Sequence, residues 1–297
     1  MNKIIILLLL TPLISSCSSL GLSALNATSK LESNHQVIEN LAYGNQEWQT
    51  LDIHIPKQNS SNPAPEAIKP VIIFLYGGGW TSGQKNQYYF AASAFTDKGY
   101  IVVLPDYIKY PEGKFPKFVH DSAKATAWVK HNIGKYGGNA DQLYIVGHSA
   151  GAHIGALLVA DEQYLLQEGL QTKDISAFAG LAGPYNFTPE EKPYTEIFGP
   201  KDQFPNMKIM NFIDGSEPPM LLLHGTKDKT VGILNKDSLI EAIKNQGGLY
   251  GDITYTGESH VGILLNLHPY FDAKNKPAND IDQFFKLYGK PTVSKMH

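Results

Sequence analysis

The amino-acid sequence predicts an α/β fold, in which a mostly parallel β-sheet carries helices on both faces. Short runs of β-forming residues recur along the chain, and most are apolar on both faces, as expected for strands of a covered parallel sheet. Stretches with the apolar spacing of helices lie between these runs, and the alternation continues to the end of the chain. The 297 residues, 42% of them hydrophobic, are enough to bury a large core, so one folded domain is expected.

The strands are predicted from apolar pattern and from the turns that bound them. In the first, at residues 49–55, Leu51, Ile53 and Ile55 alternate with polar residues and share one face. The later runs are short and mostly apolar throughout, which favours strands in the interior of the sheet. These further strands are expected at residues 71–76, 101–104, 143–146, 177–181, 220–223 and 253–255.

Three helices are predicted from apolar residues at helical spacing. The first covers residues 118–132, and the second covers 235–245 and ends just before Gly247, a natural C-cap residue. The last helix is expected to begin with Asn279 or Asp280 as its N-cap, because apolar side chains at i, i+3, i+4 and i+7 follow.

Residues 184–219 interrupt the alternation of strands and helices. This stretch shows no clear period and contains seven prolines and several aromatic residues. Irregular stretches of this length within a compact domain are usually functional. We expect a small cap or pocket wall over the carboxyl ends of the strands, where open α/β sheets bind ligands, with Tyr185 and Phe187 in an apolar pocket. A packed surface loop without substrate contact is the alternative.

The N-terminal residues predict export and lipidation. A short basic start precedes an apolar run, Ile4 to Leu10, that is too short to span a bilayer comfortably. The run leads into 13–17, a sequence similar to the bacterial lipobox, in which cleavage precedes a cysteine that becomes lipidated. We therefore expect a signal peptide at 1–16, lipidation of Cys17 and a lipid-anchored tether at 17–35, although a buried structural cysteine is the alternative.

These features predict an exported bacterial lipoprotein whose folded domain covers residues 36–297. Ser18, after the lipidated cysteine, resembles the sorting signal for the outer membrane of enteric bacteria, so the membrane would be a partner through the lipid anchor. Cys17 is the only cysteine, so no internal disulfide can form and stability must come from packing.

Composition narrows the classes of partner. The net charge is −3, and all 25 basic residues are lysine, which argues against nucleic acid as a partner. Without arginine the chain lacks the bidentate fork that proteins prefer for carboxylates and phosphates. A neutral or hydrophobic small molecule is therefore favoured as substrate over an anionic one.

The pattern G-x-S-x-G at residues 147–151 predicts a nucleophile at Ser149. It lies directly after one expected strand and directly before a stretch of small residues expected to form a helix. Such a turn is so tight that side chains two residues before and after the serine would collide, which explains glycine at both positions. A glycine-rich turn that contains a serine by chance is the alternative.

A serine nucleophile needs a base, and the base needs an orienting carboxylate. In folds with this turn the partners follow in the order serine, acid, histidine, each after a later strand. Asp228 and His260 fit that order and placement. The weaker alternatives are Asp252 and Asp202 for the acid and His268 for the base.

The other histidines are assigned no catalytic role. His148 and His153 flank the serine too closely in sequence to face it. His224 precedes its own glycine turn and is expected to be structural, and His120 and His131 lie on an expected surface helix.

The glycines after the strand at 71–76 predict an oxyanion hole. Exposed backbone amides in such a loop can stabilise the charge of a tetrahedral intermediate. We expect Gly78 and Gly79 to donate, with the amide of Ala150 as a third donor, and Trp80 to line the substrate pocket. A phosphate-binding loop is the rival interpretation, but no G-K-[ST] follows these glycines.

Five motifs in this order resemble the α/β-hydrolase superfamily. The chain is most similar to its carboxylesterase branch, which is related to hormone-sensitive lipase, bacterial feruloyl and acetyl esterases and kynurenine formamidase. The resemblance covers roughly residues 45–288. The motifs are Gly77-Gly78-Gly79-Trp80, Pro105-Asp106-Tyr107 with Tyr110-Pro111-Glu112, the serine turn at 147–151, Glu217-Pro218-Pro219 with His224 to Asp228, and Ser259-His260.

The resemblance implies an α/β-hydrolase fold and a serine hydrolase that acts on carboxylic esters without cofactor or metal. It implies Ser149, Asp228 and His260 as the catalytic triad. One position departs from the pattern: members of that branch usually have histidine where this chain has Tyr76, and there it helps to brace the oxyanion loop.

The expected function is that of a serine carboxylesterase for neutral esters with short or medium acyl groups, through an acyl-enzyme. Three alternatives remain open at this stage, of which a peptidase is the least favoured because the sequence shows no propeller and no obvious acidic pair to anchor an amine. An arylformamidase or amidase would use the same triad, and a surface lipoprotein could keep the fold as a binding module without catalysis.

Overall fold

The computed structural model contains one eight-stranded sheet, with the strand order β1-β2-β4-β3-β5-β6-β7-β8. It describes Asn26 and residues 35–57, 68–268, 271 and 276–289. The predicted signal peptide and Cys17 lie outside the described residues. Strand β2 is antiparallel to both of its neighbours, β1 and β4, and every other pair is parallel. The predicted α/β class is therefore confirmed.

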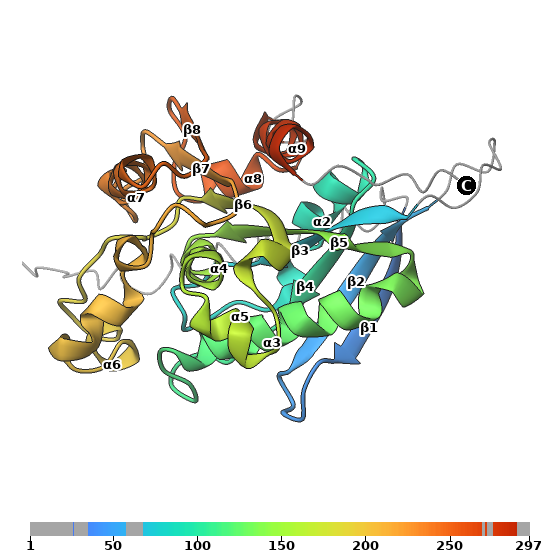
Figure 1. Cartoon of the computed structure of the whole chain (residues 1–297), viewed down its shortest axis with the longest axis horizontal. Coiled ribbons are helices and arrows are strands. Elements are labelled where there is room, and N and C mark those ends of the chain that lie inside the picture. The colour runs from blue at the N-terminus through green and yellow to red at the C-terminus, as the bar shows by residue number, and fades with distance from the viewer. Residues whose placement is uncertain (1–25, 27–34, 58–67, 269–270, 272–275, 290–297) are drawn as a thin grey trace, which may run out of the picture.

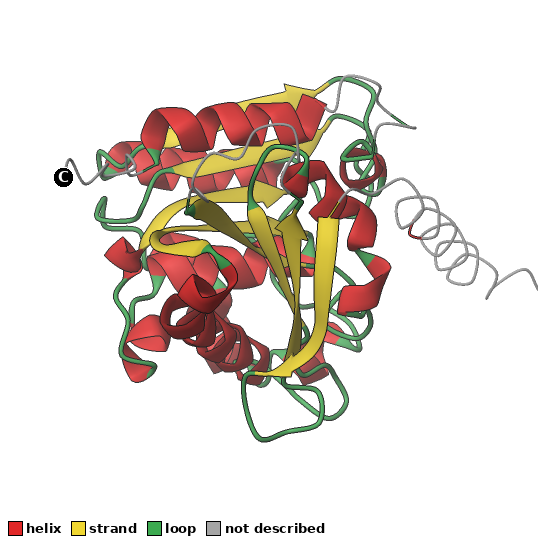
Figure 2. Ribbon diagram, turned by 90° about the vertical axis from the view of Figure 1, so that its right-hand side faces the viewer, coloured by secondary structure: helices red, strands yellow, loops and turns green. Residues whose placement is uncertain are grey.

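All seven predicted strands are present. The strands are β1 (His35–Ala42), β2 (Thr50–Pro56), β3 (Lys69–Leu75), β4 (Ile101–Pro105), β5 (Gly138–His148), β6 (Ile175–Leu181), β7 (Met220–Gly225) and β8 (Tyr250–Tyr255). Strand β5 begins five residues earlier than its apolar run, because the polar residues at its start continue the extended backbone. Figure 2 shows the twist of the sheet.

Helices cover both faces of the sheet. The helices are α2 (Tyr89–Thr96), α3 (Lys117–Asn132), α4 (Ala150–Ala160), α5 (Gln163–Gln167), α6 (Tyr194–Ile197), α7 (Leu234–Asn245), α8 (Gly262–Leu265) and α9 (Lys276–Tyr288). Helices α3 and α4 pack on one face of the central strands, and α2 and α9 pack on the other (Figure 1). Gly155 lets α4 approach the sheet closely, since a Cβ atom there would lie 2.8 Å from the Phe178 ring and 2.9 Å from Ile145.

The sequence did not predict β1 or α2. Strand β1 lies at the edge of the sheet and mixes exposed and half-buried residues, so it lacks a clean alternation. Helix α2 is buried on almost all sides, so its apolar residues follow no helical stripe.

The predicted start of the last helix is wrong. Helix α9 begins at Lys276, ahead of Asn279 and Asp280, because Pro277 is tolerated in the first helical turn. The two polar side chains bond to neighbouring elements instead of capping the helix. Asn279 accepts a hydrogen bond from Lys98, and Asp280 accepts one from the Tyr255 hydroxyl at 2.6 Å.

The structure describes two residues of the predicted tether at 17–35, Asn26 and His35. His35 is buried and forms the first residue of β1. Asn26 is buried too, and its side chain donates to the Asn86 carbonyl at 3.0 Å and accepts from the Phe90 amide at 3.2 Å. Both residues therefore contact the folded domain. A single polar side chain that satisfies backbone groups gives no apolar signal in the sequence.

The strand order places the functional loops together. The chain runs from β3 outward to β4 and then returns to β5 on the other side of β3, and ligands bind at such a switch point. The glycine loop after β3, the turn that holds Ser149 after β5, and the loops after β7 and β8 all leave the same edge of the sheet.

A buried ion pair fastens the far end of the glycine loop to the antiparallel strands. The Lys85 ammonium lies 2.8 Å from Asp52 Oδ1 and donates to the Asn40 side chain at 2.6 Å. Both charged side chains are only 7% exposed. Removal of one partner would leave the other charge buried without compensation.

We expect Lys85→Met to lower the free energy of unfolding by about 3 to 5 kcal/mol, because the Asp52 carboxylate would stay buried without its cation. Lys286→Met is the control, since Lys286 is 67% exposed where it pairs with Asp282, and it should cost less than about 1 kcal/mol. Urea denaturation of both variants measures the difference. Equal losses would contradict a structural role for the buried pair.

Candidate active site

Ser149 sits on a strained turn between β5 and α4. Its φ of 53° lies in the left-handed region, which disfavours residues with a side chain. A Cβ atom on Gly151 would lie 2.0 Å from the Leu75 carbonyl oxygen, and one on Gly147 would lie 2.5 Å from the Gly151 carbonyl oxygen. Both positions therefore require glycine for the steric reason inferred from the sequence, and the turn holds Ser149 at the end of the sheet.

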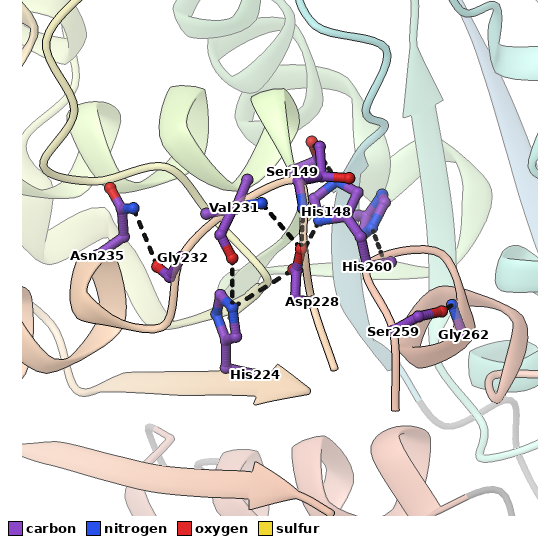
Figure 3. Close-up of polar contacts among 11 residues, drawn as sticks. His148, Ser149, His224, Asp228, Val231, Gly232, Asn235, Ser259, His260 and Gly262 are labelled. Atoms are coloured by element: carbon purple, nitrogen blue, oxygen red, sulfur yellow. Dashed lines mark hydrogen bonds and ion pairs between the residues drawn. The ribbon is translucent and has the colours of Figure 1, made fainter. Parts of the chain in front are cut away.

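Hydrogen bonds connect Ser149, His260 and Asp228 in series. Ser149 Oγ lies 2.9 Å from His260 Nε2, and His260 Nδ1 lies 2.8 Å from Asp228 Oδ2 (Figure 3). The three side chains come from the carboxyl ends of β5, β8 and β7. The arrangement can move a proton from the serine hydroxyl to the imidazole while the carboxylate holds the imidazole tautomer.

Several donors keep the Asp228 carboxylate charged. Burial acts to raise the pKa of this side chain, but the hydrogen bond from His260 and those from the backbone amides outweigh burial, so its pKa lies below the usual value. The amides of Thr230 and Val231 each donate to Asp228 Oδ1 at 2.8 Å. The oxygen that faces His260 is thus left to accept from the imidazole.

The alternatives considered from the sequence lie elsewhere. Asp252 pairs with Lys236, and its side chain is 44% exposed. Asp202 lies in an exposed 3₁₀ turn, and His268 is buried after α8. None of these three side chains bonds to Ser149 or to His260 in the part of the chain that the structure describes.

Two histidines without an assigned catalytic role hold the loops that carry Asp228 and His260. His224 Nε2 donates to the Val231 carbonyl at 2.9 Å, which closes the loop that presents Asp228. His148 Nε2 donates to the carbonyl of His260 at 3.0 Å. His148 was expected from its sequence position not to face the Ser149 hydroxyl, and the sequence gave no sign of its contact with the His260 backbone.

The glycine loop after β3 lies against Ser149. A Cβ atom on Gly77 would lie 3.0 Å from the Ser149 Cβ. The Gly78 carbonyl accepts from the amides of Thr81 and Ser82 at 3.1 and 3.0 Å, which forms a tight turn.

The loop leaves amide donors available. Within the residues placed by the structure, no backbone or side-chain group accepts a hydrogen bond from the Gly78 or Gly79 amide. Gly78 and Gly79 have φ values of 135° and 60°, which glycine adopts at low cost. Ala150 is the first residue of α4, so its amide has no acceptor within the helix. These are the three amides expected to bind an oxyanion.

Tyr76 braces the start of this loop. Its hydroxyl donates to Asp106 Oδ1 at 2.6 Å, and the Lys85 amide donates to the same oxygen at 2.9 Å. Its ring is stacked between Tyr88 and Tyr107, with centroid distances of 5.2 and 4.7 Å. One carboxylate therefore fixes both ends of the loop, at a tyrosine where the resembled branch usually has histidine.

A cleft of about 940 Å³ opens above Ser149 and His260. The described residues that line it include no Asp, Glu or Lys. Aromatic rings from the glycine loop and from the 184–219 stretch form one part of the lining, which comprises Trp80, Phe187 and Tyr194. A second apolar part follows His260 in the chain and comprises Val261, Leu264, Leu265 and Phe271.

Tyr185 does not line the cleft, contrary to the expectation from the sequence. Its side chain is 1% exposed and turns beneath the sheet end, where its ring occupies the space that Cβ atoms on Gly180 and Gly183 would need. Tyr194, which the sequence reasoning did not single out, is the aromatic residue of this stretch that joins Phe187 in the cleft. The only sign in the sequence that Tyr194 could line the cleft was the number of aromatic residues between 184 and 219.

The described residues offer no metal site, since no three His, Cys, Asp or Glu side chains among them converge on one point. No helix within the described ranges combines the length and the apolar character needed to cross a bilayer.

Comparison with known proteins identifies the family and the fold. A model of the BD-FAE family matches residues 51–243. A protein of Arabidopsis thaliana named probable isoprenylcysteine alpha-carbonyl methylesterase is 30% identical over 256 residues, which cover 77% of this chain and 52% of the relative. Esterase LipQ of Mycobacterium tuberculosis is 32% identical over 226 residues, which cover 70% of this chain and 52% of the relative. The chain thus spans about half the length of these relatives.

The solved structures show the α/β-hydrolase fold. A truncated carbohydrate esterase from gut microbiota superposes with a TM-score of 0.73 at 21% identity, covering 86% of this chain and 98% of that one. An esterase of Pyrobaculum calidifontis superposes with a TM-score of 0.74 at 18% identity, covering 93% of each chain. The fold inferred from the five motifs is therefore confirmed.

Buried neutral histidines predict a loss of stability in acid. Burial, together with the neighbouring His260, lowers the pKa of His148 to about 3, and burial lowers the pKa of His153 to about 4. In the unfolded chain both pKa values return to about 6.5. Below that pH the unfolded chain binds more protons, so the stabilisation is complete above about pH 6.5 and decreases as the pH falls toward about 4.

We expect the free energy of unfolding to decrease by up to about 1.4 kcal/mol per pH unit for each of the two histidines across this window. Urea denaturation at several pH values measures the slope. His153→Gln keeps a donor for the Met207 carbonyl, which His153 Nε2 now contacts at 2.8 Å, and removes one titrating group, so its slope should be smaller. An unchanged slope would exclude His153 as a source of the effect.

Proposed function

Because the chain belongs to the BD-FAE family, we propose that it is a serine carboxylesterase that hydrolyses neutral esters with short or medium acyl groups. The observation that carries the proposal is the hydrogen-bonded series from Ser149 through His260 to Asp228, beside a loop with free amides. The names of the curated relatives and of the structural neighbours support the same reaction class.

The reaction proceeds in two halves. His260 Nε2 takes the proton of Ser149 Oγ as the oxygen attacks the ester carbonyl, and the amides of Gly78, Gly79 and Ala150 stabilise the oxyanion. His260 then protonates the leaving alcohol, and an acyl-enzyme remains. Water repeats the sequence, with His260 as base, and releases the acid.

The cleft lining supports an uncharged substrate. A charged group on either side of the ester would lose its water and meet no oppositely charged side chain among the described lining residues, which is costly. The volume of about 940 Å³ admits more than an acetyl ester. The apolar rings of Trp80 and Phe187 favour acyl or alcohol groups without charge.

We expect Ser149→Ala to lower kcat on p-nitrophenyl esters by at least about 10³-fold with little change in stability, because it removes the nucleophile and nothing else. A series from acetyl to long acyl groups, measured with the chain from Ser18 onward, should peak at short or medium length. A p-nitrophenyl hemisuccinate, matched in size but charged, should react at least about tenfold more slowly than the butyrate.

The controls separate this proposal from its rivals. Wild-type rates in the Ser149→Ala protein would exclude Ser149 as nucleophile. An N-formyl aromatic amine that reacts faster than every ester would favour an amidase. A folded protein that neither hydrolyses esters nor reacts with a fluorophosphonate would favour a binding module.

The sequence alone carries our second proposal, that the protein is an exported lipoprotein anchored to the outer membrane through Cys17. We expect bacteria that express the full chain to incorporate labelled palmitate into it, and the Cys17→Ala variant to lose the label. Equal labelling of both proteins would contradict lipidation at this residue.

A further inference from the structure

The ring of His148 lies between the nucleophile turn and the loop that carries His260. Its Nε2 donates to the His260 carbonyl at 3.0 Å, and the two imidazole rings are 5.0 Å apart (Figure 3). On its other side, His148 Nδ1 lies 2.9 Å from the position of a Cβ atom on Gly77. The ring is therefore confined between the glycine loop and His260, and the residue is buried, with 4% of its surface exposed at the edge of the cleft.

The His260 carbonyl is free for this contact because helix α8 does not use it. The helical hydrogen bonds on either side are formed, from the Ile263 amide to Ser259 at 3.1 Å and from the Leu265 amide to Val261 at 2.9 Å. Among the described residues, no backbone amide donates to the carbonyl of His260. His148 thus supplies the donor that the helix would otherwise provide.

The remaining contacts of the His260 loop run toward Asp228. The Lys227 amide donates to the Glu258 carbonyl at 2.8 Å, and the Thr226 amide donates to the Tyr255 carbonyl at 3.0 Å. These bonds fix the loop of the base relative to the loop of the acid. The bond from His148 connects that pair of loops to β5, the strand that ends at Ser149.

His148 is held in the neutral state by burial, although the bond to the His260 carbonyl favours the charged form. Burial and the neighbouring His260 lower its pKa to about 3, against the weaker opposing effects of the hydrogen bond to the His260 carbonyl and of the Asp228 charge. A carbonyl can only accept, so the hydrogen of the neutral ring lies on Nε2. A neutral ring also adds no positive charge beside His260 when that residue carries the proton of Ser149.

We propose that His148 is a positioning residue, which holds the backbone of His260 so that His260 Nε2 reaches both Ser149 Oγ and the leaving oxygen of the ester. This inference rests on the proposed esterase function. Misplacement of a catalytic group by about 1 Å costs about 10²-fold in rate, so one hydrogen bond at this place can have a large effect.

The test compares two substitutions of His148. His148→Leu removes the donor, and we expect kcat to decrease about 10- to 100-fold with KM changed less than about twofold. His148→Gln keeps an N–H at similar reach and should recover most of the loss. Tyr100→Phe is the control, since it removes a buried hydrogen bond of 3.0 Å to Asp282 outside the cleft, and it should lower stability without lowering kcat.

A His148→Leu protein with wild-type kcat would overturn the proposal, as would a His148→Gln protein as slow as His148→Leu. If Tyr100→Phe lowered kcat as much as His148→Leu does, the loss of kcat in His148→Leu would be explained by lower stability, and the positioning role would be rejected. A wild-type protein that shows no Ser149-dependent hydrolysis would instead refute the esterase function. The NMR measurement described next tests the position of His260 even if the protein does not hydrolyse esters.

In ¹⁵N-histidine-labelled protein, His148 should be neutral and protonated at Nε2 from about pH 5 to 8. The His148→Leu variant should shift the ring resonances of His260, because the backbone that carries them moves. Unchanged His260 resonances would overturn the positioning role whether or not the protein hydrolyses esters.

Discussion

The close approach of the start of α4 to the carboxyl end of β3 is the constraint on which the site depends. Gly151 passes so near to the Leu75 carbonyl that no side chain fits, and Ser149, two residues earlier, lies in the left-handed backbone region. The glycine loop that continues β3 is thereby brought against the serine side chain. This contact between α4 and β3 thus fixes the nucleophile and the oxyanion donors relative to each other, before any catalytic hydrogen bond is considered.

The sequence predicts this part of the site well because its requirements are local. Gly147, Ser149 and Gly151 are neighbours in the chain, and only glycine meets the steric demand, so the pattern can be recognised without a structure. The strand assignments succeed for a related reason, because a sheet covered on both faces needs apolar runs. Asp228 and His260 were predicted from strand order, a rule of topology that needs no distances.

The parts that the sequence did not reveal depend on contacts between distant segments. The Tyr185 ring packs against Gly180 and Gly183, whereas Tyr194, at the start of α6, lines the cleft, and only the folded chain distinguishes the two. Strand β1 is half-exposed, and among the described strands it pairs with β2 alone. The contact of His148 with the His260 carbonyl joins residues 112 positions apart, and no spacing rule predicts it.

The position of Tyr76 shows how one geometry can be reached with different residue types. A histidine at the end of β3 could hydrogen-bond only groups close to its own backbone, whereas a tyrosine hydroxyl lies farther from the backbone. In this chain the hydroxyl reaches Asp106 beyond β4, and the same carboxylate oxygen accepts from the Lys85 amide at the far end of the loop. The Lys109 ammonium donates to the Tyr76 hydroxyl at 3.0 Å. The longer side chain thus shares one anchor with the far end of the loop, and this anchor leaves the Gly78 and Gly79 amides without an acceptor among the described residues.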